Sequence, residues 1–218
     1  MLPLQLGFQD EPLRLLCLGA HADDIEIGCG GALLRFFAER PDTEVCWAVF
    51  SGNELRRAET EASAHDYLSA LRASAAAVTV HDFREGYFPA EIAGVKDEFE
   101  KLKRACQPGL ILTHYRDDLH QDHRILSELT YNTFRDHLIW EYEIPKYDGD
   151  LGNPNLFLPL EEAHCRRKVA GLLDRFTSQR ERVWFTADTF MAMTRLRGVG
   201  CHAPSGFAEA FYCRKAVL

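Results

Sequence analysis

Short apolar runs alternate with longer stretches of helical character along most of this chain. Each run is too short for a helix, and its nearly unbroken apolar character is typical of a strand that is buried on both faces. The predicted strands cover residues 13–18, 44–50, 75–80, 110–113 and 139–144. Strands that alternate with helices form a parallel sheet with helices on both sides. We therefore expect an α/β fold: a Rossmann-like, three-layer α/β/α arrangement with a mostly parallel sheet.

The segments between the strands complete this prediction. Predicted helices cover residues 32–38, 54–71, 90–106, 120–137, 160–176 and 188–195. Residues 146–158 are rich in Asp, Gly, Asn and Pro, so we expect a loop there, and residues 207–214 form either a last strand or a packed tail. No stretch has the composition of a linker. The 218 residues therefore predict a single domain, 1–218.

Composition narrows the cellular setting. The net charge of −8 argues against a nucleic-acid partner, because such proteins usually carry a basic stripe. No apolar run approaches the roughly 20 residues of a membrane span, and the N-terminus lacks the pattern of a signal peptide. The seven cysteines are an odd number without a C-x-x-C pair, so we expect free thiols in a reducing cytoplasm. The oligomeric state stays open, a homo-oligomer included.

The first predicted strand leads directly into a polar cluster that contains His21, Asp23 and Asp24. One imidazole and two carboxylates within four residues are costly to desolvate, and a divalent cation would offset that cost. Taken alone, the cluster is also compatible with a capping Asp beside a solvated His. The glycines that follow, Gly28-x-Gly30-Gly31, are not the G-x-G-x-x-G fingerprint of dinucleotide-binding proteins, which disfavours a nicotinamide-dependent dehydrogenase.

A second polar cluster follows the fourth predicted strand. Three His and three Asp lie between His114 and His123, and His120 and His123 share one face of a helical first turn. Two strand ends of one parallel sheet bring such clusters to a single crevice. Nitrogen and oxygen ligands without Cys suit a catalytic zinc, or another divalent metal, held by three protein ligands with an open position. The remaining carboxylate and His can act as base and acid on a metal-bound water.

At these residues the chain resembles the PIG-L/LmbE-like zinc N-deacetylases. Ala20-His21-Ala22-Asp23-Asp24-x-Glu26 is similar to their A-H-P-D-D-E signature, with Ala22 in place of the usual Pro, and His120-x-Asp122-His123 is similar to their H-x-D-H motif. Weaker landmarks extend the resemblance through most of the chain. They are Arg56-Arg57-Ala58-Glu59, Ser178-Gln179, Arg197-Gly198 and Ala208-Glu209-Ala210-Phe211.

The resemblance implies a role for each residue of the two motifs. It implies zinc bound by His21, Asp24 and His123. Asp23 matches the general base, and His120 matches the residue that stabilises the oxyanion or serves as general acid. The residues by themselves do not distinguish Asp23 from Asp24, nor say which group protonates the leaving amine. The implied reaction is metal-assisted hydrolysis that releases acetate from an N-acetylated amino sugar or sugar conjugate.

Two residues outside the motifs are candidates for substrate binding. Arg56 opens a helix after a strand tip, where its guanidinium can bind a hydroxyl, phosphate or carboxylate, although a solvated charge paired with Glu59 or Glu61 is equally compatible. Tyr142 ends a strand at the same edge and can line a sugar site or simply pack. His114 and Asp118 either orient the ligand histidines or are ordinary loop polarity.

Two other functions remain open at this level. One is an amidase that acts on a larger acyl group or a thiol conjugate. The other is a metal-binding or ligand-binding module without turnover. Asp23 and His120 argue against the second, because a non-catalytic protein has little physical reason to keep a base and an acid beside three ligands.

Overall fold

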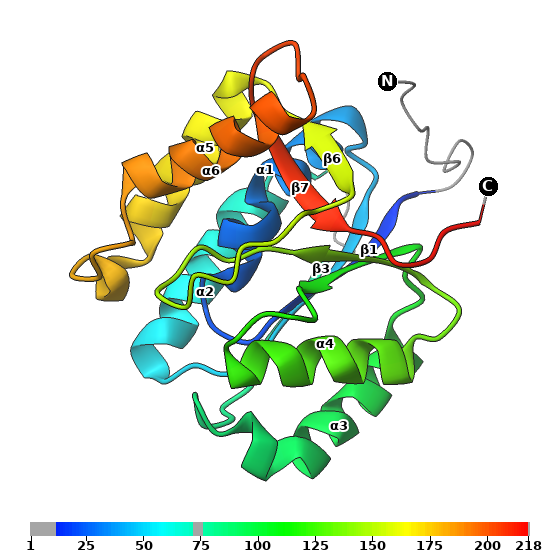
Figure 1. Cartoon of the computed structure of the whole chain (residues 1–218). Coiled ribbons are helices and arrows are strands. Elements are labelled where there is room, and N and C mark those ends of the chain that lie inside the picture. The colour runs from blue at the N-terminus through cyan, green and yellow to red at the C-terminus, as the bar shows by residue number, and fades with distance from the viewer. Residues whose placement is uncertain (1–11, 72–75, 218) are drawn as a thin grey trace.

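The computed structural model describes residues 12–71 and 76–217, and in this part of the chain seven strands form one sheet (Figure 1). Their order is β3-β2-β1-β4-β5-β7-β6. The strands are β1 (Arg14–Gly19), β2 (Glu44–Val49), β3 (Ala76–Val80), β4 (Leu110–His114), β5 (Leu138–Tyr142), β6 (Leu156–Pro159) and β7 (Ala208–Tyr212). β7 runs antiparallel to both of its neighbours, and the pairs from β3 to β5 are parallel. The predicted α/β class with a mostly parallel sheet is confirmed.

Helices cover both faces of this sheet. They are α1 (Asp24–Glu39), α2 (Glu54–Leu68), α3 (Phe88–Ala105), α4 (Gln121–Thr133), α5 (Glu162–Arg175) and α6 (Ala187–Gly200), with a 3₁₀ turn η1 (Thr177–Gln179) after α5. Figure 1 shows α3 and α4 together on one side, and α1, α5 and α6 on the other. Side chains of α2 belong to the same core cluster as those of α1 and α5.

Alternate residues of the central strand enter two separate cores. Leu15 and Cys17 of β1 pack with the helices on the α1 side, whereas Leu16 and Leu18 pack with α3 and α4. All four side chains are almost fully buried. From Leu15 to Leu18 both faces of the strand are covered, which leaves no solvent-exposed position for a polar residue, and this part of β1 is therefore a continuous apolar run in the sequence.

The strand order places a crevice where the two polar clusters are. β1 pairs with β2 on one side and with β4 on the other. From β1 the chain continues outward to β2 and β3, and it then returns to the opposite side of β1 to form β4 and β5. In open α/β sheets the carboxyl ends of the strands at such a switch point form the ligand crevice. His21 follows β1 and His114 ends β4, and both clusters therefore meet at this point.

Four element predictions need correction. The helix predicted over 32–38 already begins at Asp24, so that the glycines lie within it. The loop predicted over 146–158 contains the start of β6, which pairs with β7 from Leu156 onward, a partner more than 50 residues away. The helix predicted over 188–195 continues to Gly200. Gly198 lies within this helix, and its missing Cβ leaves room for the backbone of Gly206, whose carbonyl oxygen would lie 2.2 Å from a Cβ at this position. The helix predicted to reach residue 137 ends at Thr133.

The expectation of free thiols is wrong for one pair. Cys46 of β2 and Cys106, directly after α3, form a disulfide across 60 residues. Packing of the end of α3 against the sheet brings the two together, and no local sequence pattern reveals this. Cys17, Cys29 and Cys165 are free and buried. A cytoplasmic location therefore stays a prediction.

Two findings bear on the expectations about targeting and membranes. Residues 1–11, which include the N-terminal segment without a signal-peptide pattern, lie outside the described residues. Residue 75, at the start of the third predicted strand, also lies outside them. Within the described residues, no helix is both long and apolar enough to cross a membrane.

A buried ion pair between Lys168 and Glu209 forms hydrogen bonds with the backbone of α1 near its glycines. The N–H groups of Gly31 and Ala32 donate to the Glu209 carboxylate at 2.8 and 2.6 Å. Lys168 Nζ donates to Ile27 O and to Glu209 Oε1, both at 2.6 Å. In a regular helix the Gly31 N–H and the Ile27 carbonyl bond to each other. The pair from α5 and β7 thus bonds with both of these backbone groups, and it fixes the helix whose first turn carries Asp24.

Candidate metal centre

Three side chains from the two motifs converge at the switch point. His21 Nδ1 lies 3.1 Å from His123 Nε2 and 3.3 Å from Asp24 Oδ2, and His123 Nε2 lies 3.5 Å from the same oxygen. Ligands bound to one tetrahedral zinc at about 2.0–2.1 Å lie about 3.3 Å from each other. The three candidate atoms therefore already have the mutual spacing that a single zinc ion requires.

Local structure explains how each of these residues reaches the crevice. His21 is in the turn after β1, and its backbone N–H donates to Asp24 Oδ2 at 2.7 Å. Asp24 is the first residue of α1, where the helix dipole favours a carboxylate. His123 is in the first turn of α4, and His120 precedes that helix as its N-cap.

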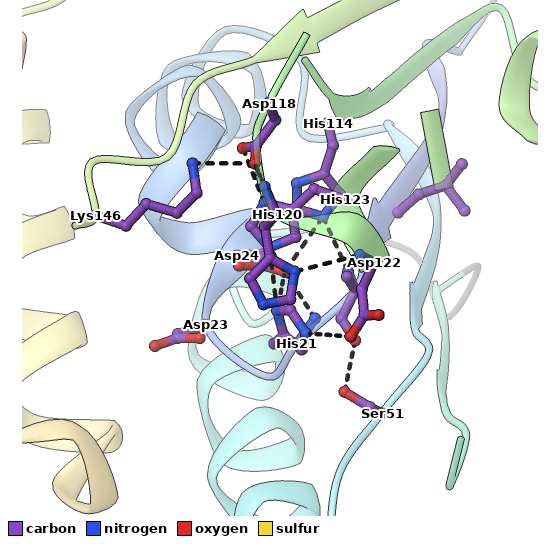
Figure 2. A network of polar contacts seen from close by, with 12 residues as sticks. His21, Asp23, Asp24, Ser51, His114, Asp118, His120, Asp122, His123 and Lys146 are labelled. Atoms are coloured by element: carbon purple, nitrogen blue, oxygen red, sulfur yellow. Dashed lines mark hydrogen bonds and ion pairs between the residues drawn. The ribbon is translucent and has the colours of Figure 1, made fainter. Parts of the chain in front are cut away.

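Two further carboxylates hold the histidine rings. Asp118 Oδ2 lies 2.9 Å from His123 Nδ1, and Asp122 Oδ2 lies 3.1 Å from His21 Nε2. Each carboxylate accepts the N–H of its ring, which assigns the tautomers and leaves His123 Nε2 and His21 Nδ1 with lone pairs. These two lone pairs face each other at 3.1 Å, and such a contact is repulsive unless a cation or a proton lies between them. The chemistry of the donor set therefore fits a metal ion (Figure 2).

The pKa values of the three candidate ligands are shifted by burial and by their mutual charges. Burial alone raises the pKa of Asp24, but three neighbouring imidazoles, led by His123, hold it well below its usual range. Burial disfavours a charged His21, yet the Asp24 carboxylate and the bond with Asp122 raise its pKa to about 10. Burial and the charge of His114 lower the pKa of His123 to about 3. In the absence of a metal, a proton on His21 supplies the positive charge.

His114 lies beneath this cluster and supports it. Two other sets of three side chains are close enough to bind one metal ion. One is His114 with Asp24 and His123, and the other is His120 with His21 and His123. His114 Nε2, however, already accepts the backbone N–H of Ala20 at 2.9 Å, so its lone pair is occupied. Its ring stacks on that of His123 with centroids 3.9 Å apart. We therefore favour His21 over His114 as the third ligand.

Tyr142 does not reach the surface of the crevice. The residue is fully buried, and its hydroxyl donates to Leu18 O at 2.5 Å. Its ring packs on Gly28, where any Cβ would lie 2.1 Å from a ring carbon. The predicted role of Tyr142 in substrate binding has no support in this placement, because the ring is part of the floor that carries His114.

Asp23 lies beside the cluster with one oxygen free. Its Oδ1 accepts a hydrogen bond from Arg56 at 2.8 Å, while the buried Oδ2 has no partner among the described residues. Burial raises the pKa of Asp23, and Arg56 opposes that shift. Figure 2 shows its carboxylate apart from the histidine rings. The second carboxylate of the motif is therefore available to exchange a proton with a bound molecule.

Arg56 is buried between carboxylates instead of being solvated. Besides Asp23, it contacts Ser178 Oγ at 3.2 Å and Glu59 at 3.6 Å. Ser178 in turn donates to Glu59 from both its backbone N–H and its hydroxyl. Two landmarks that were weak in the sequence, residues 56–59 and 178–179, thus form one network, which fixes the guanidinium against Asp23.

His120 borders the open side of the site. Its ring centroid is 4.7 Å from that of His21 and 4.6 Å from that of His123. Its Nδ1 accepts the Asp122 backbone N–H at 3.3 Å, and no hydrogen bond among the described residues involves its Nε2. Burial and the charge of His21 lower the pKa of His120.

Two residues near the metal centre were missed by the sequence analysis. Lys146 and Asp150 are in the segment predicted as a plain loop, yet Lys146 Nζ lies 3.0 Å from Asp118 Oδ1. Asp150 accepts from Lys146 and from the backbone N–H of Leu119. A Lys four residues before an Asp in a polar loop is too common a pattern to have identified them.

Three solved structures share the fold over nearly the whole chain. An N,N'-diacetylchitobiose deacetylase from Pyrococcus horikoshii has a TM-score of 0.73 at 18% identity, covering 97% of this chain and 86% of its own. A conserved protein from Thermus thermophilus has 0.72 at 20% identity, covering 94% and 96%. The 4-carboxy-2-hydroxymuconate hydratase GalB from Pseudomonas putida has 0.72 at 16% identity, covering 94% and 98%. At such identities the likeness concerns the fold alone.

A family comparison goes further than the fold. Residues 16–134 match the PIG-L family, which is described as GlcNAc-PI de-N-acetylase. This match spans more than half of the chain and includes both polar motifs. The chain therefore belongs to the PIG-L family.

Proposed function

We propose that this protein is a metal-dependent N-deacetylase that removes the acetyl group from an N-acetylated amino sugar or sugar conjugate. His21, Asp24 and His123 would hold a zinc ion. The observation that carries the proposal is the pair of opposed imidazole lone pairs beside the Asp24 carboxylate. Membership in the PIG-L family supports the reaction class, and a deacetylase is among the proteins that share the fold.

The residues around the ion divide the proton transfers between them. A bound zinc would supply Lewis acidity and lower the pKa of a coordinated water. The free Oδ2 of Asp23 accepts the proton of the attacking water, and Arg56 on Oδ1 favours the ionised carboxylate that this step requires. His120, on the open side, donates a hydrogen bond to the oxyanion or a proton to the leaving amine.

Arg56 is also the proposed contact for the sugar. Two of its donors are engaged by Asp23 and Ser178, and a guanidinium has five. The remaining N–H groups can bind a substrate hydroxyl. The position beside the base would hold the acetamide close to the ion.

A screen for acetate release tests the proposal. Purified protein is loaded with zinc and offered N-acetylated sugars, sugar nucleotides and glycosides, with and without a chelator. We expect release from at least one class, and the chelator should abolish it. N-Acyl analogues with longer chains and thiol conjugates distinguish a deacetylase from the alternative amidase. Absence of chelator-sensitive cleavage from every substrate would refute the enzymatic function, and zinc binding without turnover would leave a binding module.

A further inference from the structure

Lys146 is a buried cation that the proposed chemistry does not use. It follows β5, and only 9% of its side chain is exposed. Its Nζ lies 3.0 Å from Asp118 Oδ1 and 2.5 Å from Asp150 Oδ2, and 3.7 Å from the more exposed Asp148. An ammonium is costly to bury unless it is paired, so this placement needs a reason.

Asp118 connects this lysine to both histidines of the second motif. Its Oδ1 accepts the backbone N–H of His120 at 2.7 Å as well as bonding Lys146. Its Oδ2 lies 2.9 Å from His123 Nδ1. Figure 2 shows Lys146 reaching Asp118 from the side opposite the histidine cluster.

Asp150 forms a second contact with the segment from Asp118 to His120. Its Oδ2 accepts the backbone N–H of Leu119 at 2.7 Å, while it also bonds Lys146. The side chains of Asp118 and Asp150 are 3% and 7% exposed. The ammonium therefore bridges the two carboxylates, and the two carboxylates hold the backbone N–H groups of Leu119 and His120.

We propose that Lys146 is a positioning residue for the metal centre, acting through Asp118 on His123. It fixes the orientation of the Asp118 carboxylate, which accepts the Nδ1–H of His123 and so leaves the Nε2 lone pair facing the ion. The inference rests on the metal site of the proposed function, but not on the identity of the substrate.

Removal of the ammonium should change the orientation of Asp118 and so weaken metal binding. Without it, the carboxylates of Asp118 and Asp150 face each other with no cation between them, and Asp118 rotates out of its present orientation. This rotation removes the acceptor that orients His123. Loss of such an oriented partner costs metal sites about 10–100-fold in affinity.

The test measures zinc affinity by competition with a chromophoric chelator, on the full chain and without substrate. We expect Lys146→Met to bind zinc at least about 10-fold more weakly than the wild type, and Lys146→Arg to recover most of the loss. Lys101→Met is the matched control, because Lys101 pairs with Glu98 on the surface of α3 with 63% of its side chain exposed. The cobalt(II) absorption spectrum should shift in Lys146→Met and not in the control.

Equal zinc affinity of Lys146→Met and wild type would overturn the inference. If Lys146→Met does not fold, Lys146→Gln decides, because its neutral amide keeps a polar side chain at this position but removes the ammonium that contacts Asp118. It should weaken zinc binding and shift the cobalt spectrum in the same direction, and an unchanged affinity and spectrum would count against the proposal. Zinc binding without acetate release would refute the deacetylase and leave this inference standing.

Discussion

The ion pair inserted into α1 yields a prediction of large magnitude. Lys168 and Glu209 are 3% and 4% exposed, and Lys168→Met leaves the Glu209 carboxylate buried without its cation. Loss of one partner from a buried pair costs about 3–5 kcal/mol. Glu209 keeps the N–H groups of Gly31 and Ala32, which offset part of its charge, so we expect about 3 kcal/mol. For a chain of this length, that lowers Tm by about 6–12 °C.

Urea unfolding of the full chain, followed by circular dichroism, measures this loss. Arg166→Met is a matched control on the same helix, because Arg166 pairs with Glu162 at the surface, with 70% and 50% of the side chains exposed. We expect that control to change the unfolding free energy by less than about 0.5 kcal/mol. The double change Lys168→Met with Glu209→Gln should recover part of the loss. A cost below about 1 kcal/mol for Lys168→Met would refute the reasoning, because it would mean that Glu209 needs no cation.

Three further predictions concern the site and one distant histidine. Asp23→Asn should keep zinc and lose at least about 100-fold in turnover, since the proton acceptor is gone while the ligands stay; metal analysis and steady-state kinetics on the same sample check both. His123→Ala should fail to retain stoichiometric zinc after dialysis, and unaltered metal content would exclude it as a ligand. Burial lowers the pKa of His81, although Glu98 opposes this, so the folded protein binds its proton less readily than the unfolded chain. Stability should therefore fall as the pH drops below about 6.5, and His81→Phe, which packs beside Phe50 and Phe83, should flatten that part of the pH profile in urea unfolding.

The parts of the fold that could be read from the sequence are those fixed by local burial. Leu15 to Leu18 of β1 are apolar because both faces of the strand are covered there, and the polar residues that follow the strand mark its end. The strand β6 could not be found in this way. It has four residues in a polar context and owes its existence to β7, which lies about 50 residues later.

The residues of the candidate site likewise fall into those that local sequence motifs reveal and those that depend on tertiary contacts. His21, Asp24 and His123 were identifiable because two short motifs carry them. The pairing of Lys146 with Asp118, the disulfide of Cys46 with Cys106 and the burial of Tyr142 depend on segments that meet only in three dimensions. Side-chain identity suggested that Tyr142 would contact substrate, whereas the close approach of Gly28 places it in the core.

The proposed ligands come from two parts of the chain, with a separation of 102 residues between His21 and His123. An unfolded chain does not present them together, so an ion held there binds the native state alone. Such an ion acts as a removable cross-link between the segments after β1 and β4. At a free concentration 100 times its Kd it stabilises the fold by about 2.7 kcal/mol. The melting temperature of this protein should therefore be a readout of free metal, rising with each increment of zinc and falling when a chelator is added.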